Sequence, residues 1–294
     1  MRNDFCVFIL SHGRPDRVHT YDTLMKAGYT GKYYIVIDDE DKTAEEYRKR
    51  FGDKVLQFCK AKVAAQADEC DNFNNRKVIL DARYVCWELA KQVGCRYFCQ
   101  LDDDYTSFFI RHDSKYNYVS ARLHSRIDSV FDALIEFLVS TNATAIAMSQ
   151  GGDHIGGGGS EEHGGGQARP CLRRKCMNSW LCDVEKPIKF FGRINEDVSA
   201  YVTFGHRGQL FLTVIQAMLV QMPTQTNPGG MTDIYLHGGT YIKSFYTVMA
   251  NPSCVQIGAM GDPRGSGYRI HHKINWHAAV PKIIAEKHRK VRAS

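Results

Sequence analysis

Three consecutive carboxylates, Asp102, Asp103 and Asp104, directly follow an apolar, aromatic-rich run at residues 97–101. A run of this length and composition indicates a buried strand, and because buried strands do not tolerate unpaired charge, the carboxylates should emerge at its carboxyl end. Side chains alternate along an extended chain, so we expect Asp102 and Asp104 to point one way and Asp103 the other. Two convergent carboxylates suit Mg²⁺, Mn²⁺ or Ca²⁺, although three acidic residues taken alone are more often a solvated turn.

A second pair of carboxylates, Glu196 and Asp197, lies between an apolar turn and a segment with a helical pattern at residues 198–204. Carboxylates at a helix N-terminus are stabilised by the helix dipole, so the pair fits a helix cap. It also fits a general base presented towards a cleft. His271 and His272 end a short extended run, where neighbours face opposite sides, so at most one of them should join a given site.

Polar residues that could meet a phosphate or a sugar follow the first apolar run. Gly13 permits a tight turn there, and Ser11 and Arg14 could contact such a group, although a plain loop into a helix fits equally well. Arg76 lies at the start of an amphipathic helical pattern, where a phosphate would gain from both the guanidinium and the helix N-terminus. Taken alone, Arg76 is more often an exposed arginine.

The elements that must position these residues alternate between strands and helices. Apolar runs at residues 5–10 and 33–37 are typical of strands covered on both faces, and a shorter strand is expected at residues 54–58. This spacing favours βαβ units with a parallel sheet, whose strands present ligand sites at their carboxyl ends. The remaining expected elements are a helix opened by a capping box at Thr43, helices at 76–90, 125–138 (capped by Ser125), 240–249 and 276–289, and strands at 145–148, 210–220, 254–260 and 268–273.

Composition limits the protein class without deciding the function. The chain has 294 residues, 44% of them hydrophobic, and a net charge of +6 that is compatible with a polyanionic partner. No apolar run approaches the roughly 20 residues needed to span a bilayer, and the first apolar run is too short for a secretory signal. The ten cysteines form no disulfide framework, and Cys171, Cys176 and Cys182 are spaced too loosely for a usual zinc knuckle, so a reduced cytosol is expected.

A glycine-rich segment at residues 151–166 lacks the lysine and hydroxyl residue of a phosphate-binding loop, so we interpret it as a mobile loop or lid. Basic residues follow it closely. Such a stretch could track a nucleic-acid backbone, although a solvated basic face is the commoner explanation. The candidate DNA contacts are Arg169, Arg173, Arg174, Lys175, Lys189 and Arg193.

In their order along the chain these motifs resemble the GT-A glycosyltransferases and, more narrowly, the TET-associated glycosyltransferase family of phages. The matching stretches are residues 11–14 with Thr20 and Tyr21, 37–38, 100–107, 192–197, 229–235, 239–246 and 271–273. The resemblance implies an α/β fold of GT-A type, with a Rossmann-like, mostly parallel sheet flanked by helices. It implies a single domain over residues 1–294, with a nucleotide-sugar half at about 1–110 and an acceptor half at about 111–294.

The resemblance also implies the reaction and the roles. A sugar would pass from a UDP-sugar to the hydroxymethyl group of 5-hydroxymethylcytosine in DNA, after a TET-like dioxygenase has acted, in the cytoplasm of a phage-infected host. Asp197, with Glu196 as the alternate, would act as the base of an inverting displacement. Manganese or magnesium would be held by Asp102, Asp104 and His272 or His271. The nucleotide sugar would be bound by Ser11, Gly13, Arg14, Asp38, Arg76, Asp102 and Asp103.

Three alternative functions are consistent with part of this pattern. A metal-dependent nuclease or phosphohydrolase acting on DNA would use the clustered carboxylates but need no sugar nucleotide. A non-catalytic DNA-binding protein would need neither acidic site. A GT-A enzyme acting on a saccharide or lipid acceptor shares the fold, and fold analogy does not exclude it. Asp38 at the end of the second strand fits a donor pocket better than it fits a nuclease.

Overall fold

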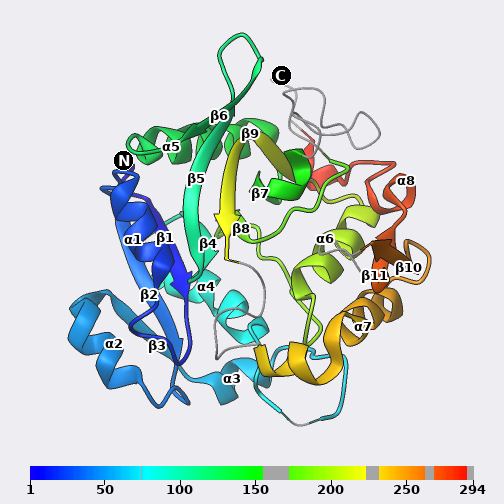
Figure 1. Ribbon diagram of the computed structural model, residues 1–294, viewed down its shortest axis with the longest axis horizontal. Coiled ribbons are helices and arrows are strands. Elements are labelled where there is room, and N and C mark those ends of the chain that lie inside the picture. Colours follow the sequence, from blue (N-terminus) through cyan, green and yellow to red (C-terminus); the bar gives the residue numbers. More distant parts are fainter. Residues whose placement is uncertain (74, 155–171, 223–231, 262–267, 290–294) are drawn as a thin grey trace.

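The computed structural model describes residues 1–73, 75–154, 172–222, 232–261 and 268–289 (Figure 1). Several predictions fall outside these residues. They concern Arg169, Cys171, the glycine-rich segment beyond His154, and the start of the matching stretch at residues 229–235.

Four parallel strands form the N-terminal half of the sheet, in the order β3-β2-β1-β4. β1 is apolar along its whole length, and its side chains alternate between two cores. Helices connect these strands and cover them, which confirms the predicted α/β class and the Rossmann-like arrangement of this half. The elements are β1 (Phe5–Leu10), α1 (His19–Lys26), β2 (Lys32–Asp38), α2 (Ala44–Phe51), β3 (Val55–Phe58), α3 (Lys60–Ala64), α4 (Leu80–Gln92) and β4 (Tyr97–Asp102).

The second half of the sheet is mixed. Five further strands continue it beyond β4 in the order β8-β7-β9-β5-β6, and of the pairings from β4 to β6 only β7–β9 is parallel in the described residues. The elements are β5 (Tyr105–His112), β6 (Tyr118–Arg122), α5 (Ile127–Thr141), β7 (Ala145–Ser149), β8 (Ser179–Asp183), α6 (Glu196–His206) and β9 (Phe211–Gln221). The hairpin of β5 and β6 projects from the body at the top of Figure 1.

The sheet curls, because two strands that are consecutive in the chain are separated in the strand order. β8, β7 and β9 lie between β4 and β5, which would place these two about 19 Å apart in a flat sheet. Only Asp103 and Asp104 connect them, and a link this short spans at most about 11 Å. The sheet therefore bends until the end of β4 meets the start of β5, and the acidic residues lie at this junction.

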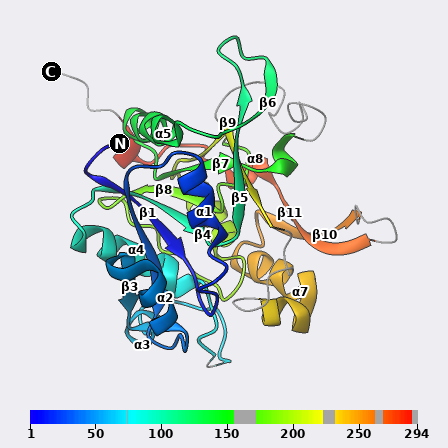
Figure 2. The ribbon, with the colours of Figure 1, turned by 60° about the vertical axis from the view of Figure 1, so that its left-hand side comes forward.

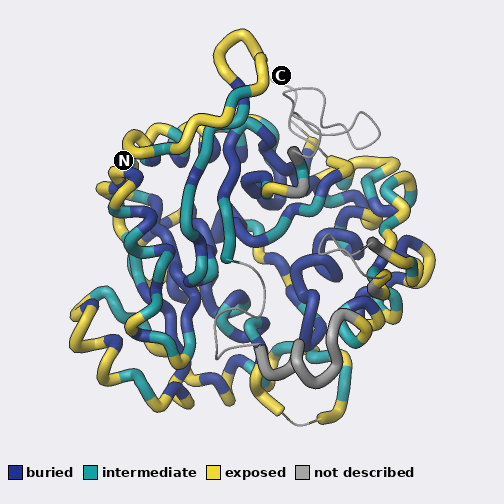
Figure 3. Tube along the Cα trace, viewed as in Figure 1, coloured by how far each residue is buried: buried dark blue, intermediate teal, exposed yellow. Residues whose placement is uncertain are grey.

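Both faces of the sheet are covered, as Figure 3 shows by the dark-blue core. On one face Phe8 and Trp180 pack with side chains of α4 and α6, including Trp87. On the other face Phe5 and Phe131 pack with side chains of α1, α2 and α5. The burial of β1 on both sides fixes where its carboxyl end lies, and so where the following loop begins.

A smaller unit completes the described chain. Figure 2 shows the two-stranded antiparallel ribbon of β10 and β11 beside α7. No described helix is long and apolar enough to cross a membrane. The elements are α7 (Thr232–Ala250), β10 (Val255–Gly261), β11 (Tyr268–Ile274), α8 (Trp276–Ala279) and three 3₁₀ turns, Gly52–Lys54, Gly151–His154 and Glu286–His288.

Several predicted details of the helices are wrong. The helix expected at residues 276–289 is only α8, which ends at Ala279, because Pro281 cannot continue a helical hydrogen-bond pattern. Ser125 caps no helix, since α5 begins at Ile127 behind Arg126, whose φ is 66°. The capping box at Thr43 does not form, because the Thr43 hydroxyl donates to Asp41 Oδ1 at 2.7 Å.

Candidate active site

The loops that follow β1, β2 and β4 meet at the carboxyl-end edge of the parallel strands. Asp103 connects two of them. Its Oδ2 accepts a hydrogen bond from Ser11 Oγ at 2.5 Å, and its Oδ1 lies 2.9 Å from Arg14 Nη2. Burial raises the pKa of Asp103 to about 6, against the attraction of Arg14. Asp103 is therefore a buried anchor for the loop after β1.

The same loop is shaped by Tyr47 and Asp41. The Tyr47 hydroxyl lies 2.6 Å from Ser11 Oγ and accepts the Arg14 backbone N–H at 2.9 Å. The Gly13 backbone N–H donates to Asp41 Oδ2 at 2.8 Å. Gly13 has a φ of +69°, a left-handed conformation that favours glycine, so the predicted tight turn is present.

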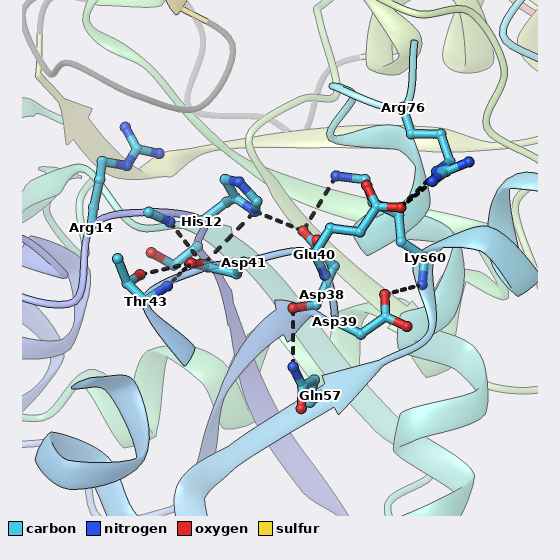
Figure 4. Close-up of polar contacts among 12 residues, drawn as sticks. His12, Arg14, Asp38, Asp39, Glu40, Asp41, Thr43, Gln57, Lys60 and Arg76 are labelled. Carbon is cyan, nitrogen blue, oxygen red and sulfur yellow. Dashed lines mark hydrogen bonds and ion pairs between the residues drawn. The ribbon is translucent and has the colours of Figure 1, made fainter. Parts of the chain in front are cut away.

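Asp38, at the end of β2, sits in a polar cluster shown in Figure 4. Its Oδ2 lies 2.8 Å from His12 Nδ1 and accepts a hydrogen bond from Lys60 Nζ at 3.3 Å. Burial alone would raise the pKa of Asp38, but His12 and Lys60 hold it below its usual value. Asp38 is therefore an anion next to the loop after β1, suited to accept N–H or O–H groups of a nucleoside. The sequence interpretation found Asp38 but not His12 or Lys60.

Arg76 lies at the rim of this cluster rather than at a helix N-terminus. α4 begins at Leu80, so the prediction that Arg76 opens that helix is wrong. Its Nε donates to Glu40 Oε1 at 2.7 Å, and its side chain is half exposed (Figure 4). Arg76 can still reach an anion from the rim, but without help from a helix dipole.

Asp102 is held by Arg83, a residue that the sequence interpretation missed. Arg83 Nη2 donates to Asp102 Oδ1 at 3.1 Å, and Arg83 Nε donates to Glu196 Oε1 at 2.6 Å. Arg83 is buried in α4, and its backbone carbonyl also accepts from the side chain of Gln100 in β4. One guanidinium therefore connects the acidic end of β4 to the start of α6.

Asp104 is buried close to the other two carboxylates, and one of its oxygens lacks a hydrogen-bond partner among the described residues. Its Oδ2 accepts from Gln221 Nε2 at 3.2 Å, whereas its buried Oδ1 has no hydrogen-bond partner among the described residues. Burial raises the pKa of Asp104 to about 7, and Asp102 and Asp103 raise it further in the same direction. A buried carboxylate oxygen without a partner, beside a second carboxylate, fits a divalent cation.

Glu196 and Asp197 lie at the start of α6, as predicted, although the helix begins at Glu196 rather than at Val198, and both are buried. Burial raises the pKa of Glu196 to about 7, although Arg83 opposes the shift. Asp197 Oδ1 accepts the Val198 backbone N–H at 2.7 Å. Because Glu196 is held by Arg83 and Asp197 by no cation within the described residues, Asp197 is the freer of the two carboxylates.

The two histidines lie beside the same turn. His272 Nδ1 is 3.4 Å from the Asn195 amide nitrogen, and Asn195 precedes α6 with a φ of 64°. Burial, then Lys175 and His271, lower the pKa of His272 to about 2, so its imidazole is neutral. The rings of His271 and His272 lie 4.1 Å apart, rather than on opposite sides of the strand.

Neither histidine joins the acidic triplet in a formed metal site. In the described part of the chain, no group of three or more His, Cys, Asp or Glu side chains is arranged to hold a metal ion. Asp102 and Asp104 are therefore the residues whose surroundings fit a cation, and the contribution of His271 or His272 remains a prediction. The cysteines in the predicted zinc region, Cys176 and Cys182, are buried and free.

The basic residues after the glycine-rich segment do not form one exposed face. Arg174 is buried and pairs with Asp153, with 3.3 Å between Nη1 and Oδ1. Arg193 is buried and pairs with Glu69 and Asp71. Among the candidate DNA contacts, Arg173 and Lys189 are exposed and Lys175 is half-buried.

Comparison with known proteins identifies a family and solved structures of similar fold. The family model of the TET-associated glycosyltransferases matches residues 5–230. No curated protein matches the chain. Among solved structures, a similar chain is the glucosyl-3-phosphoglycerate synthase of Mycobacterium tuberculosis in complex with Mn²⁺, UDP and phosphoglyceric acid. It is 9% identical, with a TM-score of 0.46, and the match covers 92% of this chain and 87% of that one.

Proposed function

Since the chain belongs to the TET-associated glycosyltransferase family, we propose that it moves a sugar from a UDP-sugar to the hydroxymethyl group of 5-hydroxymethylcytosine in DNA. The observation that carries the proposal is the bridge made by Arg83. It ties Asp102, at the edge where the loops after β1, β2 and β4 meet, to Glu196, which precedes Asp197 on α6. Arg83 thus connects the acidic end of β4 to the first turn of α6, where Asp197 follows Glu196.

The loops after β1 and β2 bind the nucleotide in this proposal. Asp38 is anionic and buried, so it accepts hydrogen bonds from the nucleoside. The turn at Gly13 brings the backbone of the loop close to the donor, with Ser11 and Arg14 fixed from behind by Asp103. Arg76, on the rim beside Glu40, contacts the diphosphate.

Asp104 and Asp102 would hold Mn²⁺ or Mg²⁺. Their surroundings fit this role, because the buried Oδ1 of Asp104 lacks a partner among the described residues and both groups are hard oxygen donors. A bound divalent ion would neutralise charge that develops on the departing diphosphate. Arg83 fixes the position of Asp102 for this purpose.

Asp197 acts as the general base. The hydroxymethyl oxygen attacks the anomeric carbon, the bond from that carbon to the UDP oxygen breaks, and the hydroxyl proton passes to Asp197. This single displacement inverts the configuration at the anomeric carbon, so a UDP-α-sugar gives a β-linked product. Glu196 is the alternate base, but its carboxylate is engaged by Arg83.

The acceptor is DNA in which a TET-like dioxygenase has already oxidised the methylated base, so the enzyme would act in the cytoplasm of an infected host. The net charge of +6 suits a polyanion. In this scheme the whole chain is one domain, with the donor half at residues 1–110 and the acceptor half after it. Arg173 and Lys189, which are exposed, remain candidate contacts to the DNA backbone.

The test is a direct transfer assay. The protein is incubated with Mn²⁺, a panel of UDP-sugars and duplex DNA that carries 5-hydroxymethylcytosine. The DNA is then digested to nucleosides, whose masses are measured by mass spectrometry. We expect a hexose or N-acetylhexosamine adduct that is lost in Asp104→Ala. UDP binding without any adduct would reject the DNA acceptor while leaving a glycosyltransferase, and cleaved DNA would favour the nuclease instead.

A further inference from the structure

A segment between α3 and α4 crosses the edge of the active site and is tied down on both sides. We call residues 68–73 and 75–76 of this segment the strap. At one end the backbone N–H groups of Gly192 and Arg193 donate to the carbonyls of Asp68 and Glu69, at 2.7 and 2.9 Å. At the other end Arg76 pairs with Glu40, in the loop that follows Asp38 (Figure 4). The strap therefore joins the donor loops to the residues just before α6.

A buried arginine fixes the middle of the strap. Arg193 donates from Nε to Asp71 Oδ2 at 2.6 Å and from Nη2 to Asp71 Oδ1 at 2.7 Å, and it also binds Glu69. The hydroxyl of Tyr246 in α7 donates to the same carboxylate of Asp71. A two-pronged ion pair of this kind gives a defined geometry as well as energy, so the strap is held in one conformation.

The strap displays one aromatic side chain to solvent. Phe73 is 68% exposed, and the guanidinium carbon of Arg193 lies 5.7 Å from the centre of its ring. Single exposed apolar side chains are common and need no explanation by themselves. Phe73 differs because its ring packs against a cation that is itself immobilised by hydrogen bonds to three residues of the strap, so an apolar surface is held in place in water.

This ring contacts the segment that leads into α6, the helix that carries the proposed base. Arg193, against which it packs, comes three residues before Glu196 in the chain, at the entrance to α6. Two further exposed rings, Tyr241 and Phe245, lie 4.6 Å apart on α7, the helix whose Tyr246 binds the strap. Figure 1 shows α7 and the strap beside each other at the bottom of the molecule.

We propose that Phe73 is an acceptor-binding residue whose ring stacks on a base of the DNA next to the modified nucleotide. The inference rests on the proposed function, since it takes DNA as the acceptor. Every nucleobase has a flat π-face, so an aromatic side chain on a fixed support binds DNA without reading its sequence. The strap then links acceptor binding to the donor loops through Arg76 and to the start of α6 through Arg193.

The test measures DNA binding and UDP binding separately, without turnover. Fluorescence anisotropy follows a labelled duplex with one 5-hydroxymethylcytosine, and UDP binding is followed by thermal shift. The variants are Phe73→Ala, Phe73→Trp and, as a matched control, Tyr116→Ala. Tyr116 is 72% exposed in the turn between β5 and β6, at the far end of the molecule from the strap (Figure 1).

We expect Phe73→Ala to weaken DNA binding by about ten-fold, the size of one base–aromatic stack, and Phe73→Trp to restore it. UDP binding stays unchanged in all variants, and Tyr116→Ala binds DNA as the wild type does. The inference is overturned if Phe73→Ala binds DNA normally, if Tyr116→Ala weakens binding equally, or if UDP binding falls together with DNA binding. If the wild type binds DNA but transfers no sugar to it, the proposed function is rejected. The role of Phe73 in DNA binding is then decided by the DNA affinities of its variants, measured by anisotropy. A wild type that binds no DNA would reject both.

Discussion

Arg83 and Glu196 are 113 residues apart in the sequence, and in the structure Arg83 Nε donates to Glu196 Oε1 at 2.6 Å. The same guanidinium reaches Asp102, so two carboxylates from different elements depend on one buried cation. Removing one partner of such a group leaves charge buried without compensation, which costs far more than the net value of the pairing.

Replacing Arg83 by methionine should destabilise the protein by about 3–5 kcal/mol, because Asp102 and Glu196 then lose their shared cation. Urea denaturation measures the change in the free energy of unfolding. The double variant Arg83→Met/Glu196→Gln should recover part of the loss, since one of the stranded charges is gone. Additive losses in the double variant would show that the two side chains do not interact.

Asp104→Asn should abolish the extra thermal stabilisation that Mn²⁺ gives in the presence of UDP. The reason is that the buried Oδ1 of Asp104 lacks a partner among the described residues and would bind the ion. Thermal shift with UDP alone, and with UDP and Mn²⁺, separates the two contributions. Asp113→Asn is the matched control, because Asp113 is an exposed carboxylate beside the β5–β6 turn. An unchanged response of Asp104→Asn to Mn²⁺ would remove Asp104 from the metal site.

Asp197→Asn should lower kcat by about 10²–10⁴-fold, the range of a lost general base, and leave UDP affinity unchanged. Glu196→Gln should affect kcat less and stability more, because it leaves Arg83 without one of its two carboxylates. Steady-state kinetics measures the first effect and denaturation the second. The sugar linkage, read by NMR, should be β, and an α-linked product would defeat the single-displacement scheme.

Asp81→Asn should stabilise the protein, and more at pH 8 than at pH 5. Asp81 is fully buried, neither of its oxygens has a hydrogen-bond partner in the described residues, and burial raises its pKa to about 7. A raised pKa means that the folded state keeps a proton that the unfolded chain has lost. Stability is therefore lost as the pH rises from about 4 to about 7, by up to about 4 kcal/mol for this group.

Melting temperatures of wild type and Asp81→Asn at the two pH values measure this difference. Other buried carboxylates shift in the same direction, so only the difference between the two proteins reports on Asp81. Asp113→Asn again serves as the exposed control. Equal effects of Asp81→Asn at both pH values would show that Asp81 is not forced to ionise in the folded protein.

The sequence could predict those parts of the candidate site that depend only on residues close together in the chain. An apolar run such as β1 must be buried, and charges at its end must leave the core, so strand ends and acidic loops follow from composition. Asp38 and Asp102 were found in this way, as were Glu196 and Asp197 at a helix start. The family match over residues 5–230 confirms the resemblance that these motifs suggested.

The parts that could not be predicted depend on partners far away in the chain. Arg83 lies in an amphipathic helix, where an arginine usually faces water, and its burial is explained by its contacts with Asp102 and Glu196. Arg193 was assigned to a basic DNA-binding stretch, whereas its partners Glu69 and Asp71 precede it by more than a hundred residues. The last helix was predicted too long, although Pro281 was a local signal that the helix ends early.

The two-residue link between β4 and β5 determines where this chain can accept new sequence. Because Asp103 and Asp104 are the only residues between β4 and β5, a peptide inserted between them would lengthen this link and would separate the carboxylates. The exposed turn at residues 113–117, at the tip of the β5–β6 hairpin, does not belong to this link. An epitope tag or a fluorescent label placed in that turn would leave the sheet closed, so the hairpin is where an engineer should attach one.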